Sequence, residues 1–223
     1  GIDKEGFCSV IMEGRGIPAK GAFPGSFSYG NDAVETVSYD PEEAKKLLEE
    51  SGWTDTDGDG YVDKDGQKLT INWLTYPTRL EQPKLAEYAQ ATLKEIGIDV
   101  SVNNTSDHRT YAENGEFDVY VSSLTTAPTG DPEYFFSSTV TGSKNYGNYQ
   151  NDEVTKLTEQ LHQTFDTDER GKLAVELQQK ILDDDAYFFV SHLNMGIVTK
   201  ANVTGMAAHP CDYYEITADL DVQ

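Results

Sequence analysis

The chain has 223 residues, of which 37% are hydrophobic, and its 39 acidic and 17 basic residues give a formal net charge of −22. A chain of this length can bury a real core, as one large domain or two small ones. The negative charge excludes a nucleic-acid partner, whose phosphates would repel this surface, and no apolar run approaches the length of a membrane span.

The chain is predicted to open with a helix and then a long irregular segment. Phe7, Val10 and Ile11 form a helical stripe over residues 3–13. Residues 14–37 contain five glycines and two prolines and show little periodicity. Segments of this kind are commonly functional or lie against another domain, so we expect such a role for this one.

An alternation of helices and strands is expected from residue 40 onward. Asp40 begins the first helix of this alternation as its N-cap, Pro41 occupies the first helical position, and Gly52 ends the helix. Apolar periodicity predicts the further elements: a strand around 69–73, a helix ending at Gly97, a strand at 98–102, a short helix around 106–113, a strand in "FDVYVSS", helices at 151–164 and 167–183, and strand-like segments at 186–191 and 195–199. The strand–helix–strand run favours a parallel pair with a right-handed crossover.

The stretch "TDTDGDGYVDKDG" resembles a calcium loop of the EF-hand type. Asp55, Asp57 and Asp59 occupy ligand positions 1, 3 and 5. Position 12 requires a bidentate glutamate, and Gly66 stands there instead. We therefore interpret the loop as an Asx- and Gly-rich turn between a helix and a strand, and keep the three aspartates as candidate metal ligands. A calcium-dependent surface adhesion module built on residues 55–63 is the alternative function from another class.

Other patterns in the chain do not assemble an active site. Residues 14–19 match GxGxxA formally, but a helix precedes them and Pro18 would break the helix that a dinucleotide site requires next, so such a site is rejected. The sequence contains no GxSxG, Walker A or HExxH pattern. His162 is expected on a helix surface, His192 is expected to be structural although it is kept as a metal candidate, and the acidic run at 183–185 is expected to be a solvated helix end. We predict a protein that is not an enzyme and has no cofactor.

The cysteines and the first residues leave two questions open. Cys8 and Cys211 form neither a CxxC nor a zinc pattern, and they could pair in a disulfide. The chain begins "GIDKEGF", without an initiator methionine and without the basic and apolar regions of a signal peptide. Because the helical pattern starts almost at once, we expect the chain to be a fragment of something longer.

Several blocks of sequence, in a fixed order, resemble the family 5 extracellular solute-binding proteins, the oligopeptide-, dipeptide- and nickel-binding components of ABC importers. The blocks are "IDKEGF", "YDPEEAKKLLEESGWTDTDGDGYVDKDGQKL", "LAEYAQATLKEIGIDV", "GEFDVYVSS", "YQNDEVTKL" and "TDERGKLAVELQQKILDDDAYFFV". They span nearly the whole chain. Members of the family often carry an Asp/Gly-rich turn after the "AKKLLEESGW" helix, which agrees with a structural role for that loop.

This resemblance implies a fold, partners and a location. The fold is an α/β C-terminal lobe of the periplasmic-binding-protein type, a mixed sheet flanked by helices, over residues 1–223. Residues 1–39 would contact the N-terminal lobe of the same protein. The implied partners are a small-molecule ligand, an ABC permease and its ATPase subunits. The implied location is outside the cytoplasmic membrane, in the periplasm or as a cell-surface lipoprotein.

The resemblance also separates two ligand classes. Peptide-binding members place an aspartate in a G-W-x-x-D pattern shortly before "DP", and here Thr125 replaces the tryptophan and Pro128 the aspartate. The run "TTAPTGDPEYFFSS" is closer to nickel-type members. Some of those carry a histidine after F-x-S-S, where Lys144 stands here, so nickel held by a small carboxylate chelator is favoured, with Arg79 or Lys144 facing its carboxylates. An oligopeptide or dipeptide ligand is the alternative.

A separate argument places the ligand at the carboxyl ends of the parallel strands, where the ligands of α/β sheets gather. Two such ends are expected at residues 76–79 and 122–131. From this argument and the resemblance together, the expected ligand-binding residues are Arg79, Thr125, Thr126, Tyr134 and Lys144.

Overall fold

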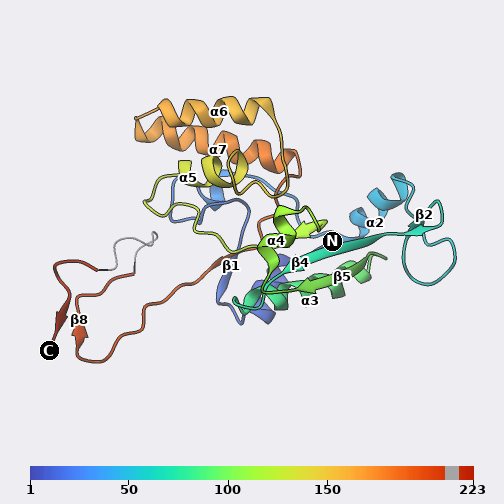
Figure 1. Ribbon diagram of the computed structural model, residues 1–223, viewed down its shortest axis with the longest axis horizontal. Coiled ribbons are helices and arrows are strands. Elements are labelled where there is room, and N and C mark those ends of the chain that lie inside the picture. Colours follow the sequence, from blue (N-terminus) through green and yellow to red (C-terminus); the bar gives the residue numbers. More distant parts are fainter. Residues whose placement is uncertain (209–215) are drawn as a thin grey trace. The chain divides into compact units, whose positions relative to one another are not determined.

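The computed structural model describes residues 1–208 and 216–223 (Figure 1). The chain divides into two compact units, and its assignment to one lobe over residues 1–223 stays a prediction. Unit 1 comprises Gly1–Gly14 and Val37–Ser123, and unit 2 comprises Arg15–Thr36 and Leu124–Gln223. Among the helices of the described residues, none has both the length and the apolar character needed to cross a membrane.

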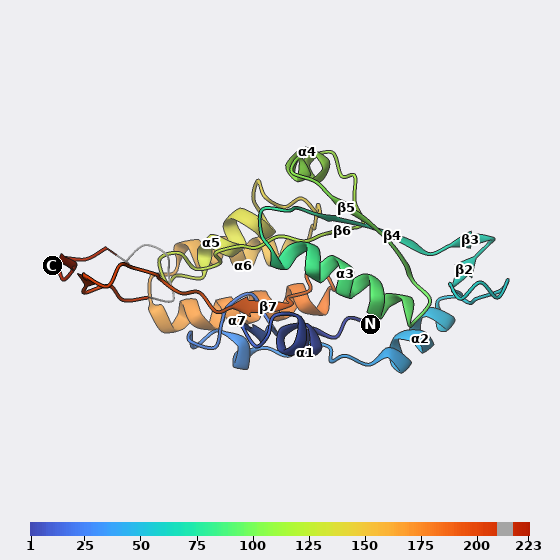
Figure 2. The same ribbon diagram turned by 90° about the horizontal axis from the view of Figure 1, so that it is seen from below.

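Unit 1 is built on a parallel three-stranded sheet in the order β5-β4-β6. Its strands are β4 (Thr70–Thr75), β5 (Asp99–Asn104) and β6 (Val119–Tyr120), and the connecting helices are α3 (Glu81–Lys94) and α4 (His108–Glu113). The two helices lie on opposite sides of the sheet (Figure 2). The predicted α/β class and the parallel pair are confirmed, and the carboxyl ends of the three strands meet at one edge.

The core of unit 1 follows the predicted apolar stripe of α3. Leu85, Ala89 and Leu93 recur at helical spacing, and all three are buried. The chain then turns at Gly97, which has a φ of +81°. A Cβ at this position would lie 2.9 Å from Val62 Cγ1, so both the backbone conformation and the close approach require a glycine.

The remaining elements of unit 1 lie outside this three-stranded sheet. They are α1 (Lys4–Gly6), the π-helical η1 (Phe7–Ile11), α2 (Pro41–Glu50), β2 (Asp63–Lys64) and β3 (Gln67–Lys68). The start of α2 is as predicted, because Asp40 accepts a hydrogen bond from the Glu43 N–H (2.9 Å) and Pro41 lies in the first turn. The antiparallel pair β2–β3 follows the aspartate-rich loop, so a strand comes after the loop, in contrast to an EF-hand.

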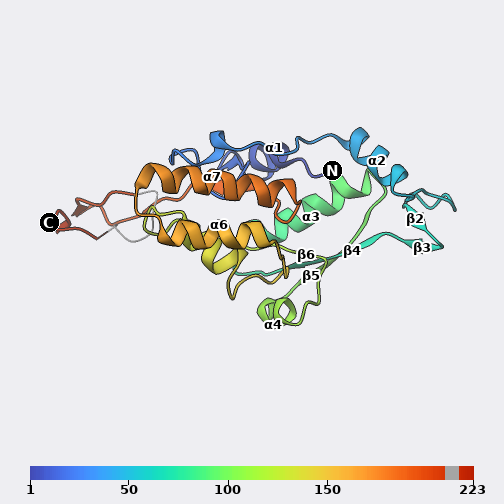
Figure 3. The same cartoon turned by 90° about the horizontal axis from the view of Figure 1, so that it is seen from above.

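Unit 2 contains a helical hairpin, α6 (Asp152–Gln163) and α7 (Thr167–Asp183), whose helices lie side by side (Figure 3). Its other elements are β1 (Gly16–Pro18), η2 (Asn31–Ala33), α5 (Glu133–Phe135), the π-helical η3 (Phe136–Val140), β7 (Ser191–Leu193), β8 (Val203–Thr204) and β9 (Asp221–Val222). Both hairpin helices agree with their predicted ranges. They share one hydrophobic core with α5 and η3, in which Phe135, Phe136, Leu161 and Leu177 are buried.

One buried side chain contacts the largely irregular segment of residues 15–36 at two points. Gln178 of α7 accepts a hydrogen bond from the Ala22 N–H (3.0 Å) and donates to the Tyr29 carbonyl (2.8 Å). Phe23 of the same segment is fully buried. Outside the short β1 and η2, buried main-chain groups of the segment are therefore satisfied by this side chain and not by regular secondary structure. The expected contact of residues 1–39 with another lobe stays a prediction.

The strand predictions near the C-terminal end were wrong. Strand-like segments were predicted at 186–191 and 195–199, but the strand is β7 (Ser191–Leu193), and 195–199 form no strand. Tyr187 and Phe189 pack against the aromatic core instead, and β1 is only three residues long, so it pairs with no more than three residues of β7. In unit 1, the third strand is likewise shorter than the stretch "FDVYVSS" predicts.

One of the two cysteines lies within the described residues. Cys8 is buried in unit 1, whereas Cys211 lies outside the described residues, as does His209. The pairing of Cys8 with Cys211 therefore stays a prediction.

Candidate ligand-binding site

In unit 1, Arg79 lies at the carboxyl edge of the sheet, in the turn between β4 and α3, and its side chain is exposed. Its carbonyl oxygen accepts a hydrogen bond from the Gln82 N–H (3.1 Å), which shapes the first turn of α3. The position agrees with the strand-end argument. Its role in ligand binding stays a prediction.

The same edge carries an aromatic cluster that the sequence argument missed. The rings of Tyr76 and His108 stack with their centroids 4.1 Å apart, and His108 Nδ1 lies 2.7 Å from Tyr120 Oη. The Tyr76 hydroxyl oxygen accepts a hydrogen bond from the Ser123 N–H (3.2 Å). Burial lowers the pKa of His108, and the neighbouring Arg109 lowers it further. This cluster connects α4 to the ends of β4 and β6.

In unit 2, the structure brings together two of the four expected residues. Lys144 Nζ donates to Tyr134 Oη (3.0 Å) and lies 5.3 Å from the centroid of the ring. Both residues are exposed. Thr126 has a different partner, because its Oγ1 donates to the Ala22 carbonyl (2.9 Å), and Thr125 is exposed. The pair of Tyr134 and Lys144 is therefore an exposed cation held on an aromatic ring.

A second charged cluster of unit 2 was not predicted from the sequence. The side chain of Arg170, only 12% exposed, donates from Nε to Asp131 Oδ2 (2.8 Å) and from Nη2 to Asp131 Oδ1 (2.6 Å). Nη2 also donates to Glu133 Oε2 (2.9 Å), and His162 Nδ1 lies 2.6 Å from Glu133 Oε1. One arginine of α7 thus engages both carboxylates that flank Pro132, in the bidentate geometry that favours arginine over lysine.

This cluster changes the acidity of both carboxylates. Partial burial by itself would raise the pKa of Asp131, but hydrogen bonds from Arg170 and from the Glu133 N–H outweigh burial and hold that pKa below its usual value. Burial would also raise the pKa of Glu133, and the hydrogen bonds to His162 and Arg170 likewise lower it. Both groups are therefore held as carboxylates.

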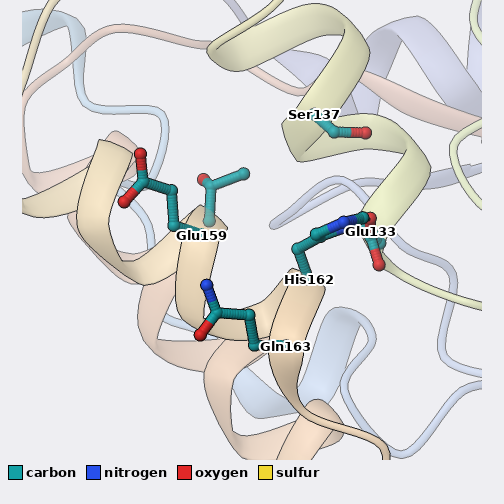
Figure 4. Close-up of a pocket in the computed structure, with 6 residues that line it drawn as sticks. Glu133, Ser137, Glu159, His162 and Gln163 are labelled. Carbon is teal, nitrogen blue, oxygen red and sulfur yellow. The ribbon is translucent and has the colours of Figure 1, made fainter.

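A shallow pocket opens beside the cluster, between the α5–η3 segment and α6 (Figure 4). It has a volume of about 220 Å³ and is lined by Glu133, Ser137, Thr158, Glu159, His162 and Gln163. His162 points toward Glu133, whereas Glu159 and Gln163 point away from that pair (Figure 4). Small-molecule sites usually enclose about 300–1,000 Å³, so we assign no ligand to this pocket.

The candidate metal ligands of the aspartate-rich loop are only partly brought together. Among the described residues, Asp55, Asp57 and Asp63 place ligand oxygens within 4.8 Å of one another. Asp59 is not in this group, and its Oδ1 accepts a hydrogen bond from the Tyr61 N–H (2.9 Å). Asp55 likewise accepts hydrogen bonds from two glycine N–H groups of the loop. These bonds are typical of the Asx turns that the sequence predicts.

His192, the other metal candidate, lies in β7 opposite Ile17 of β1. Its Nε2 is 3.3 Å from Asn31 Oδ1, in the neighbouring irregular segment. Within the described part of the chain, no metal-ligand cluster includes it. The structural role of this histidine therefore stays a prediction.

The chain is similar to known binding proteins over most of its length. It is 32% identical to the oligopeptide-binding protein AppA of Bacillus subtilis over 227 residues, covering 96% of the chain and 41% of AppA. It is 27% identical to the nickel-binding periplasmic protein of Escherichia coli, covering 94% of the chain and 41% of that protein. The chain thus spans less than half the length of these relatives.

The fold is also found in a solved relative. The structure of NikA from Staphylococcus aureus in complex with Ni(L-His)2 matches with a TM-score of 0.78 at 25% identity, covering 100% of this chain and 46% of that one. Residues 1–147 match the family described as "Bacterial extracellular solute-binding proteins, family 5 Middle". The ordered sequence blocks, the α/β fold and this match lead to one conclusion: the chain belongs to the family 5 bacterial extracellular solute-binding proteins.

Proposed function

We propose that this chain is the C-terminal lobe of the substrate-binding component of an ABC importer, and that it captures nickel or a nickel chelate by lobe closure. An N-terminal lobe of the same protein would supply the other ligand contacts. The loaded protein delivers its ligand to a permease, and separate subunits hydrolyse ATP. Family membership and the similarity to nickel-binding proteins of Escherichia coli and Staphylococcus aureus support this proposal.

The distribution of charge over residues 124–144 carries the preference for a chelate. The acids of this stretch are Asp131 and Glu133, and both are paired with Arg170. Its one base is Lys144, which is exposed. A ligand carboxylate would find a cation here, whereas a ligand ammonium would find both acids already engaged.

An oligopeptide or dipeptide ligand is the second candidate. The 32% identity to AppA is higher than the 27% identity to the nickel-binding protein of Escherichia coli, and it favours a peptide. Pro128 argues against one, because this buried proline stands where the peptide-binding members place the aspartate that pairs with the ligand ammonium.

Analysis of the ligand that copurifies with the full-length protein tests the two candidates. We expect elemental analysis to find nickel in protein purified without a chelator, and none after treatment with a strong chelator. Mass spectrometry of the same preparations looks for peptides. Copurified peptides of two to five residues, without nickel, would replace the first candidate with the second.

Lobe closure also makes a prediction for the chain studied in isolation. We expect it to fold and to bind nickel, nickel with L-histidine, and short peptides only weakly, because part of the contacts would come from the other lobe. Calorimetric titration measures this. Micromolar or tighter binding by the isolated chain would contradict the two-lobe account.

The proposed role places the protein outside the cytoplasmic membrane, in the periplasm or on the cell surface as a lipoprotein. The charge of −22 would disfavour adsorption to anionic lipid headgroups and keep the lobe in solution. Cell fractionation followed by immunodetection tests the location. Recovery mainly in the cytosol, or ATPase activity in the purified full-length protein, would contradict this role.

A further inference from the structure

Arg170 uses all five of its N–H groups within one cluster. Besides the three bonds to Asp131 and Glu133, its Nη1 donates to the carbonyl oxygens of Leu161 and Thr164, both at 2.6 Å. A guanidinium offers five donors in a fixed fork, so none is left over here. A lysine, with three donors on a point charge, could not reproduce this set.

The partners of Arg170 come from two places in unit 2: the carboxylates on either side of Pro132, and carbonyl oxygens at the end of α6. Leu161 and Thr164 lie at the end of α6, while Arg170 lies near the start of α7. The arginine therefore ties the carboxylates of Asp131 and Glu133 to the connection between the two hairpin helices. Glu133 directly precedes Tyr134. The bond from Arg170 to the Glu133 side chain therefore restrains the residue next to the expected ligand contact.

The bonds made by Arg170 also determine which charges of residues 124–144 are available to a ligand. The two carboxylates bound to Arg170 are the only acids of residues 124–144. In a chain with 39 acidic and 17 basic residues, release of these carboxylates would make the segment acidic. Lys144 would then no longer dominate the charge beside Tyr134.

We propose that Arg170 is a positioning residue that sets the charge selectivity of the segment 124–144. It holds Tyr134 where Lys144 can pair with it, and it withholds Asp131 and Glu133 from the ligand. The proposal rests on the proposed function in one respect, namely that the transported ligand contacts this segment.

The experiment compares Arg170→Gln with Lys172→Gln in the full-length protein. Lys172 lies on the same helix, pairs with the exposed Glu169, and its substitution removes the same charge without touching the cluster. Calorimetry measures the affinities for two probes, the anionic chelate Ni(II)–EDTA and the cationic peptide trilysine. Hydrogen exchange without ligand measures the protection of the amides of residues 131–134.

We expect Arg170→Gln to weaken Ni(II)–EDTA binding about tenfold, which corresponds to about 1.4 kcal/mol, and to strengthen trilysine binding. Exchange at residues 131–134 should accelerate. Lys172→Gln should leave the ratio of the two affinities and the exchange rates at their wild-type values. An equal change of the affinity ratio in both variants would overturn charge selectivity through Arg170, because a general loss of positive charge would explain it.

Arg170→Lys keeps the proposal testable if Arg170→Gln does not fold. We expect it to retain the wild-type affinity ratio, because the charge remains, and to accelerate exchange at residues 131–134, because donors are lost. Unchanged exchange in either variant would overturn the positioning role. If the wild type binds neither probe, charge selectivity through Arg170 is overturned, whereas the proposed function is decided separately by the copurified ligand. The exchange data still decide whether Arg170 positions the segment.

Discussion

Two groups of acidic residues in this protein are satisfied in different ways. In unit 1, the aspartates of the loop at residues 55–63 accept hydrogen bonds from the loop itself. Asp55 accepts from the N–H groups of Gly58 (2.7 Å) and Gly60 (3.0 Å), at sequence separations of three and five residues. These carboxylates are exposed or only partly buried, and all of these partners are neutral.

In unit 2, by contrast, the acids depend on a distant cation. Asp131 and Glu133 pair with Arg170, which lies 39 and 37 residues further along the chain. The arginine is largely buried, so water competes poorly for it, and charge-assisted bidentate hydrogen bonds are stronger than neutral ones. The loop is therefore a local structure of modest energy, whereas the arginine cluster exists only when unit 2 is folded.

Arg170→Gln should have the largest effect, because it removes the cation of the unit 2 cluster and leaves the loop of unit 1 intact. We expect the free energy of unfolding of unit 2 to fall by about 2–3 kcal/mol at pH 7, because two partly buried carboxylates lose their cation. Urea denaturation followed by circular dichroism measures it. Lys172→Gln should stay within about 0.5 kcal/mol of the wild type. Equal losses in the two variants would mean that the cluster is no stronger than a surface pair.

Acid denaturation should show the next largest effect, because the two groups of acidic residues should contribute differently to its pH dependence. The pKa values of Asp131 and Glu133 are lowered in the folded protein. Their contribution to stability is therefore complete above their unfolded values of about 4 and is lost as the pH falls through the lowered folded values. Unfolding measured between about pH 5 and pH 2 should show a smaller loss of stability for Arg170→Gln than for the wild type. If the free energy of unfolding fell equally with pH in the wild type and in Arg170→Gln, the Arg170 cluster would contribute nothing to the acid dependence.

The control for this acid dependence lies in the loop. Hydrogen bonds from the Thr56 N–H and hydroxyl lower the pKa of Asp63, so the sign of its pH dependence is the same. Asp63 makes these bonds at an exposed site, where water screens and competes. Asp63→Asn should therefore retain nearly all of the wild-type acid dependence.

Asp55→Ala should have a smaller effect, confined to the loop. We expect a loss of about 1 kcal/mol of stability in unit 1, because two main-chain N–H groups lose an acceptor but remain open to water. Hydrogen exchange at Gly58 and Gly60 should accelerate. Asp65→Asn, in the turn between β2 and β3 directly after the loop, serves as the control and should leave both measurements unchanged. A loss as large as that of Arg170→Gln would contradict the description of the loop as a local structure.

Calcium should have the smallest effect. We expect millimolar calcium to raise the melting temperature by about a degree or not at all, consistent with weak or absent binding, since ligand binding stabilises the folded state only as far as the ion is bound. Differential scanning calorimetry with calcium and with EGTA measures the shift. A rise of many degrees that Asp57→Asn abolishes would instead favour the calcium-dependent adhesion module.

The candidate site could be predicted only in part. Strand ends and family motifs pointed to Tyr134 and Lys144 separately, and the structure places their side chains in contact. Thr126 came from the same argument, but its hydroxyl bonds the Ala22 carbonyl. Arg170 was missed, because an arginine in an amphipathic helix gives no sign in the sequence of which acids it will meet.

Features that depend on near neighbours along the chain were predictable from the residues alone. Four such features depend on residues only a few positions apart: the N-cap of α2, the apolar stripe of α3, the two hairpin helices, and the Asx turns of the loop at 55–63. Helical and strand periodicities and side-chain caps act over such distances. The ordered blocks that identify the family are local patterns of the same kind.

Contacts between groups that are distant in the chain became known only from the folded structure. The stacking of Tyr76 on His108, the pairing of β7 with β1, and the engagement of Asp131 by Arg170 each join residues from separate parts of the chain. These contacts depend on how helices and strands pack, and residue spacing along the chain does not encode that packing. The pairing of Asp131 and Glu133 was decided in this way, because it depends on one arginine meeting two acids across the fold.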